Sequence, residues 1–527
     1  MNESTIENLL IQLLQEQGYT YQHGSSTIPQ ADPQLRTARD EVILSPILKK
    51  QLKIINPSAS ESALKEVYQK LTHLDASDLL SKNEQFHQWL RDGIKVESFH
   101  DGETENEHIF LVDQEHLERN DFRVINQFTV RENNLEKRCD VVIFINGMPL
   151  VLIELKNPLD ENADLYRAYT QIQNYQTAIP SLFQYNGLCV ISDGIEARVA
   201  PFSAPFSRYL AWKEPVDAQK WWVTSELEVL TKNLLDPATL LDIVINYTVF
   251  ENEEQKDEET GQIFINKLKK TAAYHQYYAV EKAITSTLQA VNGDHKIGVV
   301  RHTQGSWKSL SMVFYAGKLI THPELKNPTL LVITDRNDLD DQLFGTFSNA
   351  RWLLRQTPQQ AESREHLKSL LKVAWWGIVF STIQKFFPEE GNVFDTLSKR
   401  ENIIVIADEA HRSQYGFKAK AVLNEKTKES ELRYGNAKYL RDALPNASFI
   451  GFTGTPIERT DKSTRWVFGD DIDVYDIKQA VEDGATVPIS YESRLLKIWI
   501  DQSVLEEIDA SIEEFNNVDP SDKKNRV

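Results

Sequence analysis

Apolar and polar positions follow two different periods along this chain, and the change between them marks its first structural boundary. Over roughly the first 95 residues, apolar side chains recur at helical spacing, as they do over residues 6–14 before Gly18. From Ile109 onward the period shortens to two, so that residues 122–130 alternate as one face of a strand does. The pattern predicts a mainly helical N-terminal part followed by a sheet.

A strongly apolar hairpin follows these alternating residues. Its first strand covers residues 138–145, an Asn-Gly turn stands at 146–147, and its second strand covers 149–158. The second strand carries Glu154 and Lys156 inside an otherwise apolar run. Burying a carboxylate and an ammonium costs free energy unless both find partners, so we expect these two side chains to be paired.

Asp140, on the first strand, completes a set that suits phosphodiester hydrolysis. Two carboxylates can bind Mg²⁺, which activates water, while a lysine nearby positions that water or stabilises the developing charge. Glu154 and Lys156 share a face because side chains alternate along a strand. Asp140 joins that face only if the connection has an odd length, as with residues 146–148, or if a strand carries a bulge. We predict the odd loop or the bulge, and a salt-bridged core hairpin is the alternative interpretation.

The helix expected over residues 160–178 adds two further polar side chains. Gln171 and Tyr175 are four residues apart and therefore lie on one helical face. Together with the hairpin they resemble the PD-(D/E)xK nucleases, some of which carry a QxxxY element, although Cys139 stands where that pattern often has proline. The resemblance implies that Gln171 and Tyr175 support the catalytic carboxylates and lysine.

The second half of the chain alternates apolar strands with helical segments. Strands are expected at residues 297–300, 329–336, 377–386, 403–407 and 447–452. Such alternation predicts a parallel α/β sheet with right-handed connections and a binding site at the carboxyl ends of its strands.

The first of these strands runs into residues 302–310, a small-residue turn that leads into a helix. This arrangement directs backbone N–H groups and a helix N-terminus at an anion. Lys308 would contact the β- and γ-phosphates of a nucleotide, and the Ser309 hydroxyl would bind Mg²⁺. Trp307 stands where glycine is usual, so we expect its indole to crowd the β-phosphate and weaken or abolish nucleotide binding unless the loop is rearranged. The loop residues assigned to the nucleotide are Thr303, Gly305, Ser306, Lys308 and Ser309.

Three further motifs would complete a nucleotide site; two follow the loop in the sequence and one precedes it. Asp408 ends an apolar strand and would hold Mg²⁺, while the adjacent Glu409 would orient the attacking water. Thr453 and Thr455 belong to a polar turn able to sense the γ-phosphate. Gln276 precedes the loop, and its amide can pair with both hydrogen-bonding edges of adenine.

Composition narrows the class of protein. The formal net charge is −20 and the isoelectric point is near 5.2, which argues against a basic surface that binds nucleic acid everywhere but permits a local basic groove. Cys139 and Cys189 are the only cysteines, so neither a disulfide framework nor a cysteine zinc site is expected. The sequence contains no apolar run long enough to span a membrane and no signal peptide, which favours a cytoplasmic protein.

The order of these motifs resembles the restriction and motor (HsdR) subunits of type I restriction enzymes. The matching phrases are LIELKNP, NYQTAIP followed by SDG, YHQYYAV, HTQGS-x-KS, DRNDLDDQ, DEAHRSQYG, GFTGTPIE and YESR. The resemblance implies a PD-(D/E)xK-like mixed α/β nuclease domain followed by a RecA-like parallel α/β ATPase domain. It also implies ATP-driven translocation and Mg²⁺-dependent cleavage of double-stranded DNA, with methyltransferase and specificity subunits as partners. A repair or type III nuclease-helicase, and a motor-dead protein that only docks on DNA or partners, are the alternatives.

Four segments follow from this interpretation. We expect a nuclease domain with a helical N-terminal part at 1–250, an acidic connector at 251–265 and a first RecA-like domain at 266–470. Residues 471–527 would be an interdomain or linker segment, too short for the second RecA-like domain that such motors need. We therefore expect a fragment of a longer subunit that does not translocate alone.

Overall fold

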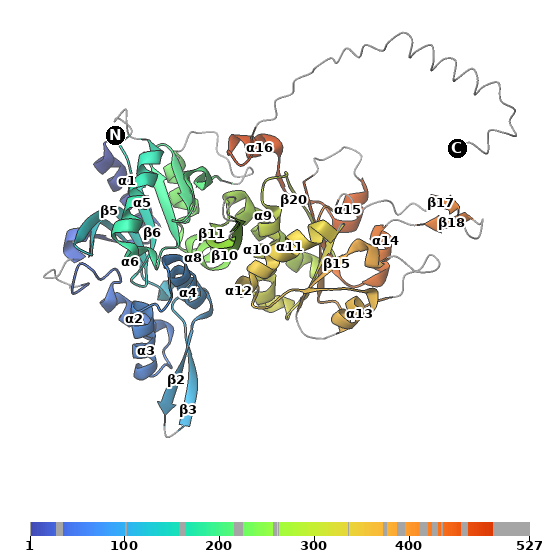
Figure 1. Ribbon diagram of the computed structural model, residues 1–527, viewed down its shortest axis with the longest axis horizontal. Coiled ribbons are helices and arrows are strands. Elements are labelled where there is room, and N and C mark those ends of the chain that lie inside the picture. Colours follow the sequence, from blue (N-terminus) through green and yellow to red (C-terminus); the bar gives the residue numbers. More distant parts are fainter. Residues whose placement is uncertain are drawn as a thin grey trace, which may run out of the picture. The chain divides into compact units, whose positions relative to one another are not determined.

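The computed structural model (Figure 1) describes residues 2–27, 35–100, 103–157, 164–214, 225–256, 261, 263–335, 337–372, 377–386, 396–410, 420–423, 430–433, 436–454 and 462–487. Met1–Thr486 form one unit, to which all of the following refers. No helix of the described residues is long and apolar enough to cross a lipid bilayer.

The N-terminal part is helical, as its period predicts. Its helices are α1 (Glu3–Glu16), α2 (Ser45–Ile55), α3 (Glu61–Thr72) and α4 (Leu79–Asp92). Polar caps start three of them: the side chains of Asn2, Ser60 and Asp78 each accept a hydrogen bond from a backbone N–H in the first turn. A hairpin of β2 (Ile94–His100) and β3 (Glu103–Ile109) packs against α3 (Figure 1).

A mixed sheet of seven strands follows, in the order β1-β4-β5-β6-β7-β8-β9. Its strands are β1 (Thr20–His23), β4 (Phe122–Glu132), β5 (Leu135–Ile145), β6 (Met148–Leu155), β7 (Leu188–Ser192), β8 (Ala197–Ala200) and β9 (Leu210–Ala211). The β1–β4 and β6–β7 pairs are parallel and the other pairs antiparallel. Both α1 and α5 (Leu165–Ala178) contact β6, the strand that carries Glu154.

Within the acidic stretch expected to be a solvated connector, residues 251–256 and 263–265 belong to the strands of a hairpin. Strands β10 (Thr248–Lys256) and β11 (Ile263–Thr271) pair antiparallel along their whole length. Glu251 is half-buried and forms an ion pair with Lys270 at 2.5 Å. Cross-strand pairing of this kind offsets the charge that suggested a linker. Short helices α6 (Pro180–Phe183), α7 (Glu226–Asn233) and α8 (Pro237–Asn246) precede the hairpin.

The second seven-stranded sheet is parallel throughout, as the alternation of strands and helices predicts. Its order is β14-β15-β13-β16-β19-β12-β20. The strands are β12 (Lys296–His302), β13 (Thr329–Thr334), β14 (Gln359–Gln360), β15 (Gly377–Thr382), β16 (Ile403–Ala407), β19 (Ser448–Thr453) and β20 (Asp471–Tyr475). The helices are α9 (Tyr274–Val291), α10 (Lys308–Thr321), α11 (Asn337–Asn349), α12 (Arg351–Leu354), α13 (Arg364–Lys372), α14 (Asn436–Ala443), α15 (Lys462–Phe468) and α16 (Ile477–Glu482). A separate pair joins β17 (Lys420–Leu423) to β18 (Ser430–Arg433).

Alternate residues of these strands face two different apolar clusters. On β13, Leu330 and Val332 belong to one cluster, while Leu331 and Ile333 belong to the other. Burial of both faces explains why the strands are continuous apolar runs rather than alternating ones.

Residues 471–487 also differ from the sequence prediction, which placed them in an interdomain or linker segment. β20 pairs parallel with β12 at the edge of the sheet, and α16 follows it. Asp473 anchors this edge, because it forms an ion pair with Lys282 at 2.9 Å and a hydrogen bond with His302 Nε2 at 2.8 Å. Tyr475 stacks on His275 with the ring centroids 4.0 Å apart.

Candidate nuclease and nucleotide sites

A β-bulge brings the two candidate carboxylates of the hairpin onto one face. Residues 145–148 form a tight two-residue turn, which alone would put Asp140 on the wrong side. The register then shifts next to residues 143–144, and Leu150 is the extra residue. Extended by one step, the shifted register sets Asp140 opposite Glu154. The bulge, one of the two predicted solutions, is confirmed.

Lys156 lies at the centre of a continuous set of hydrogen bonds. Its ammonium donates to Glu154 Oε1 at 2.7 Å and to Gln171 Oε1 at 3.0 Å. The Gln171 amide donates to the Tyr175 hydroxyl at 2.6 Å, and that hydroxyl donates to the Arg138 carbonyl at 2.9 Å. The structure therefore places together the five residues that the sequence assigned to this site: Asp140, Glu154, Lys156, Gln171 and Tyr175.

Burial governs the electrostatics of the carboxylates. It raises the pKa of Asp140, although a 2.9 Å hydrogen bond from the Leu155 N–H favours the ionised form. Burial, and next the charge of Asp140, raise the pKa of Glu154 well above its usual range. Glu154 Oε2 is buried and accepts no hydrogen bond from the described residues. Two desolvated carboxylates with a free oxygen fit a divalent cation, although no group of three or more His, Cys, Asp or Glu side chains with metal-ligand geometry occurs among the described residues.

Glu7, on α1, is a buried carboxylate near this site and is only 9% exposed. It accepts hydrogen bonds from Asn126 Nδ2 and Gln127 Nε2, both at 2.6 Å, and its charge contributes to the raised pKa of Asp140. The signal was present in the sequence, because Glu7 precedes the apolar residues 10–11 by three and four positions and therefore shares their buried face.

The nucleotide-site candidates gather at the carboxyl edge of three adjacent strands. Lys308 follows β12, Thr453 ends β19 and Asp408 follows β16. Burial and the neighbouring Glu409 raise the pKa of Asp408 to about 6, and the Lys308 charge opposes the shift. The position at the strand ends is the one predicted for a ligand of a parallel sheet. Thr455 lies outside the described residues.

The loop between β12 and α10 is held by its own small residues and by the edge strand. Ser306 donates to the Thr303 carbonyl from its hydroxyl at 2.7 Å and from its N–H at 3.3 Å. The Thr303 N–H donates to the Tyr475 carbonyl at 2.9 Å. Gly305 has φ +90°, in the left-handed region that glycine allows.

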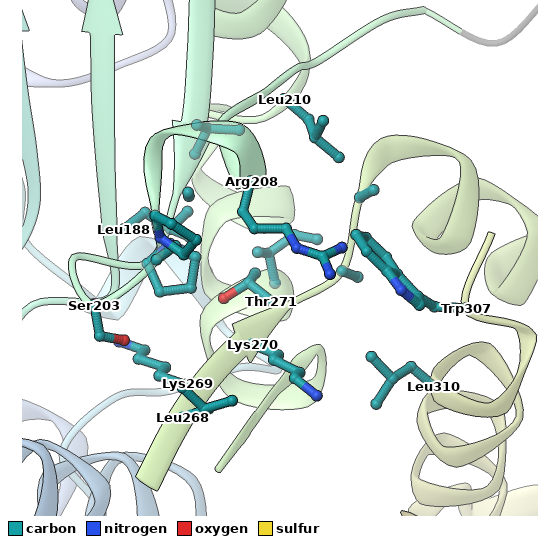
Figure 2. Close-up of a pocket in the computed structure, with 18 of the residues that line it drawn as sticks. Leu188, Ser203, Arg208, Leu210, Leu268, Lys269, Lys270, Thr271, Trp307 and Leu310 are labelled. Atoms are coloured by element: carbon teal, nitrogen blue, oxygen red, sulfur yellow. The ribbon is translucent and has the colours of Figure 1, made fainter. Parts of the chain in front are cut away.

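Trp307 occupies the N-cap position of α10 with φ 53° and ψ 48°, a left-handed conformation that glycine adopts without strain. Its indole lies under the guanidinium of Arg208, 4.1 Å from Cζ to the ring centroid (Figure 2). The Lys308 ammonium lies beside Gly454, away from the Arg208 contact: a Cβ built on Gly454 would be 3.0 Å from Lys308 Nζ. Ser309 follows in the first turn of the helix. The sequence predicted neither the conformation of Trp307 nor its partner.

Gln276, assigned to adenine by its position, is 1% exposed and already engaged. Its Oε1 accepts from the Ala273 N–H at 3.0 Å, and its Nε2 donates to the Trp307 carbonyl at 3.1 Å. The amide thus joins the start of α9 to the loop. A role in adenine binding remains a prediction, and it requires this amide to exchange at least one of these bonds.

Comparisons with known proteins match two parts of the chain to two different families. Residues 1–208 match the family of the type I restriction enzyme R protein N terminus, and residues 275–525 match the SWI2/SNF2 ATPase family. The chain is 46% identical over 526 residues to the type I restriction enzyme HindI endonuclease subunit of Haemophilus influenzae, covering 98% of this chain and 48% of that protein. It is 35% identical over 538 residues to the putative MjaIXP endonuclease subunit of Methanocaldococcus jannaschii, covering 99% and 49%.

Among solved structures, a fragment of a putative HsdR subunit of a type I restriction enzyme from Vibrio vulnificus aligns over 68% of this chain and 56% of that chain, at 16% identity and a TM-score of 0.25. By the two family matches, the chain joins an R-protein N-terminal domain to an ATPase domain of the SWI2/SNF2 class. It belongs to the family of type I restriction enzyme R subunits. The chain spans about half the length of the curated relatives it matches.

Proposed function

We propose that the N-terminal domain is a Mg²⁺-dependent nuclease of the PD-(D/E)xK type that cuts double-stranded DNA. The observation that carries the proposal is the bulge at Leu150, which sets Asp140 opposite Glu154 beside the ammonium of Lys156. Asp140 and Glu154 would hold the ion. A bound Mg²⁺ would supply an activated water and stabilise the charge that develops on the phosphate.

The other side chains have roles that follow from their bonds. Lys156 carries the positive charge closest to the carboxylates, where it can orient the water or stabilise the transition state. Gln171 accepts from that ammonium and Tyr175 fixes Gln171, so both are positioning residues. The raised pKa values of Asp140 and Glu154 also imply that a divalent cation is bound best when both have lost their protons, and therefore less well as the pH falls.

For the second domain we propose ATP binding with Mg²⁺ at the carboxyl edge of the parallel sheet. Lys308 would contact the phosphates, Ser309 and Asp408 would hold the ion, and Glu409 would orient the attacking water. ATP-driven translocation would belong to the assembled enzyme, with methyltransferase and specificity subunits as partners. We assign residues up to about 250 to the nuclease domain and residues from 266 through α16 to the ATPase domain.

Plasmid cleavage tests the nuclease. The chain is assembled with its methyltransferase and specificity subunits, and Mg²⁺- and ATP-dependent cleavage is compared for wild type, Lys156→Ala and Lys232→Ala. Lys232 is a surface lysine paired with Glu228, and serves as the matched control. We expect Lys156→Ala to lose cleavage by about 100-fold or more and the control to keep it. Equal cleavage by all three would make the hairpin structural and the proposal wrong.

Metal binding gives a second test that needs neither partners nor a motor. Mn²⁺ is titrated calorimetrically into the chain as wild type, Glu154→Gln and Glu136→Gln, the last being a surface glutamate on strand β5. Binding that survives Glu154→Gln would remove that carboxylate from the metal site. We expect it to disappear in Glu154→Gln and to persist in Glu136→Gln, because the amide loses the charge that attracts the ion.

A further inference from the structure

We propose that Arg208 is a positioning residue for the phosphate loop. Its guanidinium holds the Trp307 indole away from the Lys308 ammonium, so that the loop can bind a nucleoside triphosphate although a tryptophan stands at its glycine position. The inference rests on the proposed ATP site and adds to it a residue from the N-terminal domain.

The backbone of Trp307 determines where its side chain starts. Its carbonyl accepts from Gln276 Nε2 at 3.1 Å, from the Leu310 N–H at 3.0 Å and from the Ser311 N–H at 3.3 Å. These three donors fix the peptide plane after residue 307 and hold its left-handed conformation. Which side of the loop the indole occupies therefore depends only on rotation about the side-chain bonds of Trp307.

One side of the loop offers the indole an apolar surface. A cavity of about 390 Å³ lies between the N-terminal sheet, β11 and the start of α10. Trp307 lines it with Arg208, and Figure 2 shows the Arg208 side chain reaching across the cavity toward the ring. Other lining residues are Leu188, Leu210, Leu268, Thr271 and Leu310. A guanidinium 4.1 Å above an indole is within the range of a cation–π contact, which favours this side.

The other side of the loop holds the Lys308 ammonium, the charged group that would contact a triphosphate. A Cβ built on Gly454 would lie 3.0 Å from Lys308 Nζ, 3.5 Å from the Gln304 nitrogen and 3.6 Å from the His302 carbonyl oxygen. These groups are therefore crowded together at the mouth of the loop. An indole that turned toward them would compete with the phosphates for the same space.

The segment that carries Arg208 is held in place by contacts of its backbone and of neighbouring side chains. Its N–H donates to the Pro205 carbonyl at 2.9 Å, and the next residue, Tyr209, is buried. Four residues further along, Trp212 is buried against Tyr277 of α9, with the ring centroids 5.8 Å apart. The segment is thus attached both to its own sheet and to the ATPase domain, on either side of Arg208.

A second contact strengthens this attachment. Lys213 forms an ion pair with Asp483, the residue that follows α16, and the same carboxylate accepts hydrogen bonds from Tyr274 at 2.6 Å and from Tyr475 at 2.8 Å. Among the described residues no carboxylate forms an ion pair with Arg208. The ring of Trp307 is therefore the partner that the structure gives to its charge.

A double-mutant cycle tests the inference. Binding of a non-hydrolysable ATP analogue with Mg²⁺ is measured by calorimetry in the whole chain for wild type, Arg208→Ala, Arg208→Lys, Trp307→Gly and the Arg208→Ala/Trp307→Gly pair. We expect Arg208→Ala to weaken binding about tenfold when Trp307 is present and less than about twofold when residue 307 is glycine. Arg208→Lys should fall between wild type and alanine, because an ammonium lacks the flat stacking face.

Arg198→Ala is the matched control, since Arg198 is partly exposed, pairs with Glu196 and lies 5.9 Å from the ring of Phe206. It should leave nucleotide affinity unchanged. Thermal melting of each variant separates loss of fold from loss of binding.

Each of the remaining outcomes contradicts either the inference about Arg208 or the proposed ATP site. An equal loss for Arg208→Ala in both backgrounds means that Arg208 touches the nucleotide or supports the fold, and overturns the inference. No loss in either background overturns it too. Binding by Trp307→Gly but not by wild type means that the indole blocks the loop, which overturns the inference and leaves the ATP site standing. Absence of binding in every variant, with the fold intact, contradicts the proposed ATP site itself.

Discussion

The candidate nuclease hairpin and the candidate phosphate loop hold their polar side chains in place in different ways. At the hairpin, Lys156 bonds to Glu154 of β6 and to Gln171 of α5, which contacts β6 in the same domain. The phosphate loop depends on partners that are distant in the sequence. The Tyr475 carbonyl accepts a hydrogen bond from the Thr303 N–H, and Gln276 Nε2 donates one to the Trp307 carbonyl. The Arg208 guanidinium lies over the Trp307 ring.

The difference teaches where each site tolerates change. A buried hydrogen-bonded set loses a partner for every residue removed, so the hairpin should be sensitive at each member. In the proposed ATP site the loop would present one face to the phosphates, and its other face borders the cavity beside Arg208. A bulky residue at 307 can be placed on the second face, where neighbouring elements supply a surface for it. The predictions below test whether the two sites respond differently to substitution.

The largest expected effect is on nucleotide affinity. Lys308→Ala should weaken ATP binding about 100-fold, because a charge-assisted contact to the phosphates is lost. Calorimetry on the chain measures this beside Lys368→Ala, an exposed lysine of α13. Mn²⁺ binding at the hairpin should not change. A simultaneous loss there would show that the two sites are not independent.

Glu7→Ala should lower the free energy of unfolding by about 2–3 kcal/mol, because two buried amide donors lose their charged acceptor. Glu16→Ala, on the same helix but exposed, is the control. Urea unfolding followed by circular dichroism gives both values. If the two variants unfold alike, the buried bonds of Glu7 contribute little.

Gln171→Ala should reduce cleavage by the assembled enzyme about tenfold while Mn²⁺ affinity stays within about twofold of wild type. The reason is that Gln171 touches the Lys156 ammonium and neither carboxylate. Asn174→Ala, an exposed residue of the same helix, serves as the control. Loss of metal affinity in Gln171→Ala would instead place the glutamine at the ion.

The smallest effect depends on pH. The pKa of Asp408 in the folded chain is about 6, above the ordinary 3.8, so folding favours its protonated form. The stability contributed by this proton is complete below about pH 4 and is lost as the pH rises through about 6. Asp408→Asn should therefore raise the free energy of unfolding at pH 7.5 by about 1–2 kcal/mol and change it little at pH 4. Melting at the two pH values measures it, and a gain of equal size at both would contradict the assignment.

Much of the fold could be predicted because local periodicity encodes it. The helical N-terminal part and the parallel sheet followed from spacing alone, and so did the strand that carries Glu154. The parity of side chains along a strand even required an odd loop or a bulge. The sequence could not choose between them, because the choice depends on how β6 pairs with its neighbour, where the Leu150 carbonyl accepts from the Gly187 N–H at 2.7 Å.

By itself, the sequence predicted which residues carry chemistry: the carboxylates and lysine of the hairpin, and the lysine and acidic pair of the ATPase domain. Only the tertiary structure decided their partners. It turned the acidic stretch into the β10–β11 hairpin, added β20 to the sheet, buried Glu7 and placed the Trp307 ring on Arg208. The physical reason is distance along the chain. Spacing within a segment fixes the face on which a side chain lies. The residue that contacts this side chain comes from another segment, about a hundred positions away in the sequence for Glu7 and for Trp307.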